Sequence, residues 1–134
     1  MRRSLSLHAA ALAGSASACL LLLALFSPMT VIGASMTPAL PEGSVVLVFK
    51  AAYGLPSAQG ALVSWARPSS GDVVVFYEPL TGALSVKRCA SSPADDIILL
   101  GDQPGASIDS RHYGPVAPRL LAGRVIWVLR RGLG

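Results

Sequence analysis

Hydrophobic residues form one long block near the start of the 134-residue chain and a series of short runs after it. The long block covers residues 9–26, and no formally charged residue occurs between Ser4 and Pro41. A helix needs about 20 apolar residues to cross ~30 Å of hydrocarbon, and extending the block back to Leu5 or forward to Ile32 supplies them. The pattern therefore predicts one N-terminal transmembrane helix.

The charges beside this block predict the orientation of the chain. Arg2 and Arg3 precede it, so the positive-inside rule leaves the N-terminus in the cytoplasm and everything after Pro28 outside. The segment also fits a cleaved secretory signal with the small residue Ala34 at the cleavage site, although Ile32 is a poor partner two positions earlier. Both alternatives place the body outside the cytoplasm. With a retained anchor, the chain would cross the inner membrane once and contact the lipid bilayer.

The short runs predict strands, because they are rich in β-branched residues and are separated by turn residues. They cover residues 44–49, 61–65, 72–77, 83–88, 97–100 and 124–129. Segments rich in Gly and Pro predict loops at 54–60, 67–72 and 101–105. No segment after the block shows ten residues of helical periodicity, which is typical of a small, mostly antiparallel β domain. We expect a cytoplasmic tip and anchor at 1–29 and an extracytoplasmic β-rich domain at 30–134.

Composition narrows the class of protein further. Hydrophobic residues make up 52% of the chain and charged residues only 13%, which excludes a disordered acidic or basic tail protein. The net charge of +4 comes from arginines at the two ends, and the remaining seven basic residues are balanced by seven acidic ones. No basic stripe with interleaved aromatic residues occurs, so we expect no nucleic-acid partner.

Cysteine and histidine are too few for several kinds of chemistry. Cys19 lies in the long apolar block, so a disulfide with Cys89 is not expected. No Cys/His cluster with metal-ligand spacing occurs, and we expect neither a metal nor a cofactor. Past the block, His112 is the only histidine available to a Ser-His-Asp triad, and nothing in the sequence resembles a nucleophile elbow.

Lysine is also scarce, with only Lys50 and Lys87 in the chain. Lys87 lies in a strand-like segment with apolar flanks, where it can be an edge-strand lysine that discourages aggregation. This segment alone favours that interpretation over the alternative, a desolvated lysine with a lowered pKa that acts as a general base. Ser35 lies nine residues after the apolar block, where its side chain would be near the outer membrane surface.

The segment from Gly33 to Pro38, followed by Leu40 and Glu42-Gly43, resembles the nucleophile box of type I signal peptidases. Segments similar to the further boxes of this family follow in order at 71–76, 86–88 and 101–116, and the closing segment 121–125 fits the end of the family pattern. The resemblance covers about residues 30 to 129, and four boxes in the family's order after one apolar segment make it specific.

The resemblance implies that Ser35 is the nucleophile and Lys87 its general base. A serine hydroxyl needs a neighbouring base, and a lysine is a base only when burial keeps it neutral.

The resemblance also assigns supporting residues. Arg88 is part of the box that carries Lys87, and Ser107 would hydrogen-bond the lysine and orient it. Asp109 and Arg111 would form a salt bridge that supports the site.

Three departures from the family pattern stand out. Gly33 takes the place where many bacterial members carry a serine that contributes to the oxyanion hole, so the hole would use backbone N–H groups, including that of Ser35. The segment 89–95 keeps Pro93 and Asp95 but lacks the two glycines usual there. The chain is also short, so a large inserted β subdomain cannot fit between residues 96 and 101.

The resemblance predicts exported preproteins as substrates, cut after small residues with Ala-x-Ala favoured. An extended substrate can bind by strand addition, with alternate side chains in pockets, and Met36 is the expected apolar pocket wall. Alternatives are a peptidase dedicated to a conjugative pilin-type precursor and a catalytically inactive relative that kept the fold. A self-cleaving repressor-type peptidase also uses a Ser-Lys dyad, but it fits neither the N-terminal anchor nor the lack of a DNA-binding segment.

Overall fold

The structure, a computed structural model, describes residues 2–133, without the side chains of residues 2–7 and 9–11. The orientation predicted from the charges of Arg2 and Arg3 therefore lies outside the described side chains. The helices and strands are α1 (Arg2–Leu25), β1 (Phe26–Thr30), β2 (Val45–Phe49), β3 (Gly54–Ser57), β4 (Gly60–Ser64), β5 (Val73–Tyr77), β6 (Leu84–Ser91), β7 (Ile98–Leu100), α2 (Ser110–Tyr113) and β8 (Leu121–Arg130). Two 3₁₀ turns, η1 (Pro104–Ala106) and η2 (Pro118–Leu120), complete the list.

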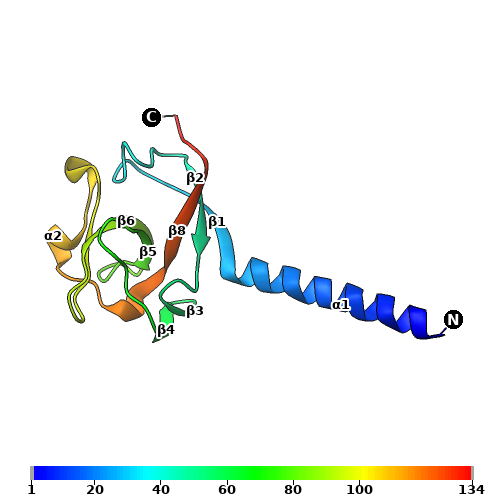
Figure 1. Cartoon of the computed structure of the whole chain (residues 1–134). Coiled ribbons are helices and arrows are strands. Elements are labelled where there is room, and N and C mark those ends of the chain that lie inside the picture. Colours follow the sequence, from blue (N-terminus) through cyan, green and yellow to red (C-terminus); the bar gives the residue numbers. More distant parts are fainter. Residues whose placement is uncertain (1, 134) are drawn as a thin grey trace.

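The N-terminal helix α1 projects away from the β-rich body (Figure 1). Its segment is rich in alanine and leucine, which have high helix propensity, and Pro28 soon after Leu25 is unfavourable for further helix. The leucines at 20–23 are between 58% and 68% exposed. None of the helices in the described part of the chain has the length and hydropathy that a membrane crossing requires.

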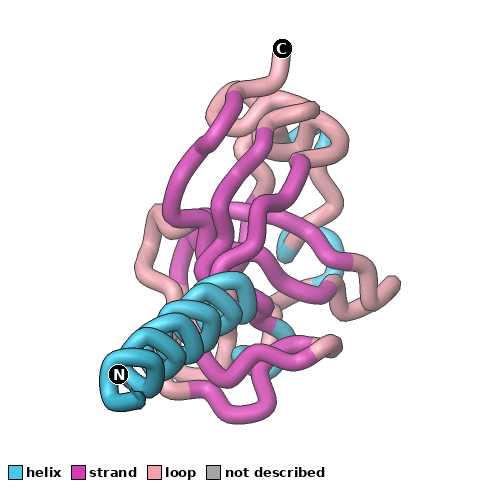
Figure 2. The backbone as a smooth tube through the Cα atoms, turned by 90° about the vertical axis from the view of Figure 1, so that its right-hand side faces the viewer, coloured by secondary structure: helices cyan, strands magenta, loops and turns pink. Residues whose placement is uncertain are grey.

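The body is a six-stranded sheet in the order β1-β2-β8-β5-β6-β7, with the two-stranded hairpin β3-β4 beside it (Figure 2). Every neighbouring pair of strands is antiparallel. The predicted class, a small and mostly antiparallel β domain, is confirmed.

All six predicted strands are present, with ends that lie within three residues of the predicted ones. Two further strands were missed. β3 falls in the segment 54–60 that was predicted as a loop, so that part of the prediction is wrong. β1 pairs with β2 along its whole length, which means that the sheet begins at Phe26, four residues before the predicted boundary at residue 30. Pro28 is tolerated in β1 because this strand lies at the edge of the sheet.

The sheet has a hydrophobic core on each face, and β5 contributes to both. Val74 and Phe76 lie in one core with Cys89 and Leu99, whereas Val75 belongs to the other core. A continuous apolar run is what a strand buried on both faces requires. The neighbouring strand β6, which carries Lys87, also packs on both faces, because Cys89 lies in the first core and Val86 packs against the second.

Candidate active site

Ser35 lies in the loop between β1 and β2 and is half-buried. Its carbonyl oxygen accepts a hydrogen bond of 2.9 Å from the backbone N–H of Gln103, which ties this loop to the segment after β7. On either side of it, Met36 is fully buried in the core and Gly33 has a φ of 81°. Because glycine adopts this left-handed conformation without a Cβ penalty, the turn favours glycine at position 33.

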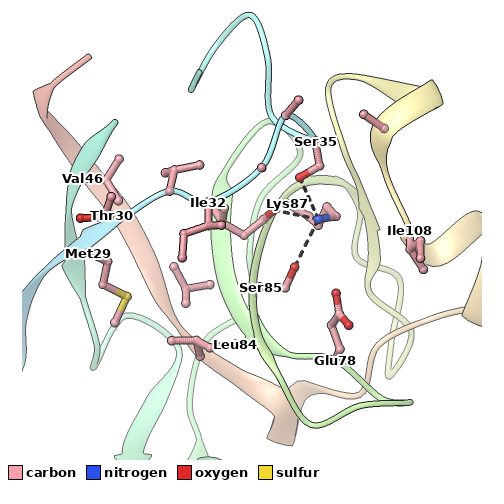
Figure 3. A pocket seen from close by; sticks show the side chains of 16 residues that line it. Met29, Thr30, Ile32, Ser35, Val46, Glu78, Leu84, Ser85, Lys87 and Ile108 are labelled. Carbon is pink, nitrogen blue, oxygen red and sulfur yellow. Dashed lines mark hydrogen bonds between the residues drawn. The ribbon is translucent and has the colours of Figure 1, made fainter. Parts of the chain in front are cut away.

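Lys87 lies on β6 opposite Val74 of β5 and is only 4% exposed. Its Nζ donates hydrogen bonds of 3.1 Å to Ser35 Oγ, 3.2 Å to Ser85 Oγ and 3.2 Å to the carbonyl oxygen of Val86 (Figure 3). Burial lowers the pKa of Lys87, and the negative charges of Glu78 and Asp109 offset part of this effect. A buried amine with a lowered pKa thus touches the Ser35 hydroxyl, which is the arrangement that a serine nucleophile and a lysine base require.

Asp109 is fully buried and connects the residues around the site. Its carboxylate accepts hydrogen bonds from Ser107 Oγ at 2.6 Å and from the backbone N–H of Gly101 at 2.8 Å, and it forms an ion pair with Arg111. Burial opposes ionisation of this carboxyl, but the hydrogen bonds from Arg111, Ser107 and Gly101 outweigh burial and hold the pKa of Asp109 below its usual range. Asp109 therefore fixes the loop whose Gln103 holds Ser35.

Gly101 occupies a position where no side chain fits. A Cβ there would lie 2.2 Å from Ser107 Oγ and 2.7 Å from the carbonyl oxygen of Ser35. The close approach of these two segments therefore depends on the absence of a side chain at residue 101.

Arg88 follows Lys87 but serves another part of the structure. Its guanidinium makes a two-pronged ion pair with Asp102, with hydrogen bonds of 2.8 and 2.7 Å, and donates to the carbonyl oxygen of Gly71. These contacts raise the pKa of Arg88, chiefly through the hydrogen bond with Asp102. Arg88 thus joins β6 to the segment after β7 through hydrogen bonds to Asp102 and Gly71.

The structure places two residues, Ser107 and Met36, differently from the sequence-based expectation. Ser107 donates to Asp109, and its expected place beside the Lys87 amine is taken by Ser85. Met36 is 0% exposed and packs in the core, so the expectation that it forms a wall of the pocket is wrong: this apolar side chain lies beneath the surface.

His112 is more than half exposed, and its Nδ1 accepts a hydrogen bond from the backbone N–H of Asp109.

Sequence reasoning missed Ser85, although a signal for it was present. Successive side chains of a strand alternate between faces, so a residue two positions before Lys87 must share its face. A serine at that position can reach the amine, as Ser85 does.

A cavity of about 650 Å³ opens beside Ser35 and Lys87. One wall is the segment 29–35 and the other is Leu84–Lys87, with Glu78, Val75 and Ile108 also lining it. β7 pairs only with the part of β6 from Arg88 onwards, so the outer backbone edge of Leu84–Lys87 is unpaired among the described residues. The cavity therefore lies between the unpaired edge of Leu84–Lys87 and the segment 29–35. No three His, Cys, Asp or Glu side chains in the described part of the chain are grouped to hold a metal ion.

Comparison with known proteins identifies the family. A family model described as signal peptidase, peptidase S26, matches residues 4–99, which is more than half of the chain. The chain therefore belongs to the signal peptidase family, peptidase S26. The matched region contains Ser35 and Lys87 and ends before Ser107 and Asp109.

Curated relatives of this chain are named signal peptidase I. Signal peptidase I of Buchnera aphidicola subsp. Baizongia pistaciae is 37% identical over 73 residues, covering 52% of this chain and 24% of the relative. Signal peptidase I of Buchnera aphidicola subsp. Schizaphis graminum is 32% identical over 75 residues, covering 54% of this chain and 24% of the relative. The matched region thus spans about a quarter of the length of the curated relatives.

Proposed function

We propose that this protein is a serine endopeptidase that removes signal peptides from exported preproteins with a Ser35–Lys87 dyad. The observation that carries the proposal is the 3.1 Å contact between Lys87 Nζ and Ser35 Oγ, made by a lysine that is 4% exposed at the wall of an open cavity. A structural lysine that only discouraged aggregation at a strand edge would point into solvent. Family membership supports the same activity.

In the proposed reaction, neutral Lys87 takes the proton of the Ser35 hydroxyl while Oγ attacks the carbonyl carbon of the peptide bond. The tetrahedral intermediate collapses, the C–N bond breaks and Lys87 returns the proton to the leaving amine. Lys87 then deprotonates a water molecule, which attacks the acyl ester; the ester C–O bond breaks and Lys87 returns the proton to Ser35 Oγ. The hydrogen bond from Nζ to Ser85 keeps the amine near Ser35 through these steps.

The backbone N–H of Ser35 is a candidate donor to the oxyanion. Within the described residues it donates to no other acceptor, and Gly33 offers no side-chain hydroxyl for this task. Removing one donor from such a site typically costs ~10²–10³ in rate. A hole built from backbone groups is therefore consistent with the glycine at position 33.

Substrate would bind as a strand between the unpaired edges of Leu84–Lys87 and the segment after β1. Side chains of an added strand alternate between faces, so the first and third residues before the cut share one face of the sheet. Val31, Val75 and Val86 line the cavity and leave room for small side chains. This geometry supports cleavage after Ala-x-Ala sequences.

An extracytoplasmic location at the inner membrane remains part of the proposal. It rests on the apolar segment that ends in the exposed leucines of α1. Fractionation of cells, followed by protease treatment of intact spheroplasts, tests this location. Digestion of the β domain only after lysis would contradict it.

The direct test of the activity is processing of a preprotein in detergent by the full chain. We expect the native chain to release the signal peptide, Ser35→Ala to be inactive with unchanged folding, and Ser70→Ala, at an exposed serine outside the cavity, to remain active. Processing by Ser35→Ala at the native rate would refute the nucleophile. A panel of general preproteins and a pilin-type precursor separates a general enzyme from a dedicated one, and no cleavage of either would favour an inactive relative.

A further inference from the structure

Glu78 is an acidic side chain at the junction of two cavities. It follows β5, is half-buried, and lines the 650 Å³ cavity that also contains Ser35 and Lys87. It lines as well a second cavity of about 450 Å³ with Gln59 and Arg119. Apart from Lys87, Glu78 is the only ionisable residue that lines the first cavity within the described chain.

The carboxylate of Glu78 is held in a fixed place. The backbone N–H of Glu78 donates to the carbonyl oxygen of Ala83, which extends the β5–β6 pairing by one step, and Thr81 Oγ1 donates to Oε2 at 2.9 Å. The step of two along β6 puts Ser85 on the same face as Lys87, and Figure 3 shows the carboxylate of Glu78 directed towards Ser85. Glu78 forms no ion pair with any described Lys or Arg.

A carboxylate at this position works against the proposed chemistry. Its negative charge favours the protonated form of Lys87, whereas general-base catalysis needs the neutral amine. A cation placed beside Glu78 would remove this penalty and would also pair the carboxylate. No described Lys or Arg forms an ion pair with Glu78, and this includes Arg119, which lines the second cavity with it. A basic side chain of the substrate could supply the missing cation.

We propose that Glu78 is a specificity-determining residue that binds a lysine or arginine side chain of the substrate. This inference rests on the proposed function. Because the small-residue positions, first and third before the cut, face the Val86 side of the added strand, the basic residue would stand at the second or fourth position. Such a requirement would restrict the enzyme to a subset of precursors with a basic residue next to the cleavage site.

The test measures peptide binding separately from cleavage. Fluorescein-labelled peptides with Ala at the first and third positions, and Lys, Gln or Glu at the second or fourth, are titrated with full-length Ser35→Ala in detergent. We expect the Lys peptide to bind roughly three- to tenfold more tightly than the Gln peptide, the Glu peptide to bind most weakly, and 0.5 M salt to reduce the difference.

Two matched variants test whether Glu78 is the residue responsible for the preference. Adding Glu78→Gln should abolish the preference for Lys over Gln, while Glu42→Gln, which neutralises an exposed carboxylate outside both cavities, should retain it. Equal affinities for all three peptides, or a preference that survives in Glu78→Gln, would overturn the inference. Cleavage of the Lys peptide by the native chain tests the proposed function independently, because an absence of cleavage leaves the binding comparison valid.

Discussion

Replacing Asp109 with alanine tests how strongly the buried carboxylate supports the site. The change leaves the Ser107 hydroxyl and the Gly101 N–H without their acceptor, and each orphaned buried group costs ~1–3 kcal/mol. It also removes the partner of Arg111, but that side chain is 39% exposed and water can solvate it. We therefore expect Asp109→Ala to lower the free energy of unfolding by about 3–5 kcal/mol, a large share of the ~5–15 kcal/mol typical of a domain.

The loss should depend on pH with a defined sign. The pKa of Asp109 is lower in the folded chain than in the unfolded chain, so its carboxylate stabilises the fold fully above the unfolded value near ~4. This stabilisation fades as the pH falls through the folded-state pKa. The difference between native and variant is therefore largest near neutrality and should narrow below about pH 4.

Urea unfolding of the detergent-solubilised full chain, followed by tryptophan fluorescence at pH 7 and at pH 3, measures both effects. Asp96→Ala serves as the control, because Asp96 is exposed and its side chain makes no hydrogen bond with the described residues. A loss below ~1 kcal/mol for Asp109→Ala, or an equal loss at both pH values, would refute the role assigned to this carboxylate.

Three further predictions concern catalysis. Lys87→Arg should be as inactive as Lys87→Ala, because arginine cannot be deprotonated, whereas His112→Ala should process preprotein normally; the opposite pattern would indicate a histidine base. The rate should fall as the pH drops through the lowered pKa of Lys87, and a rate that stays level well below pH 5 would contradict a lysine base. Ser85→Ala should reduce kcat more than KM and move the acid limb of the pH profile, while Ser85→Thr, which keeps the hydroxyl, should restore most of the activity.

Most strands could be predicted from local sequence patterns, whereas the edge strand β1 could not. β-branched runs bounded by turn residues mark strands directly, as 72–77 does for β5. β1 was hidden because Phe26–Thr30 continues an apolar block and contains a proline, and only pairing with β2 makes it a strand. Local patterns describe a segment, whereas an edge strand is defined by its neighbour.

The surroundings of the lysine were harder to predict for the same reason. Which serine reaches Lys87 depends on the twist and register of β6 and on how closely the segment of Ser107 approaches, and here Asp109 holds Ser107. Met36 was expected at the surface because it follows Ser35, yet the turn directs it into the core. Neighbours in sequence fix distance along the chain but not the direction of a side chain.

The extended binding mode proposed for the substrate has a consequence for the timing of processing. Under the proposed function, a single extended chain lies between the edge of Leu84–Lys87 and the segment after β1, and a folded domain rarely offers such a chain with both of its edges free. A precursor whose cleavage site has already joined a helix or a sheet would first have to unfold locally. Under the proposed function, cleavage therefore competes with folding of the exported protein, and a site that stays extended longest is cut most completely.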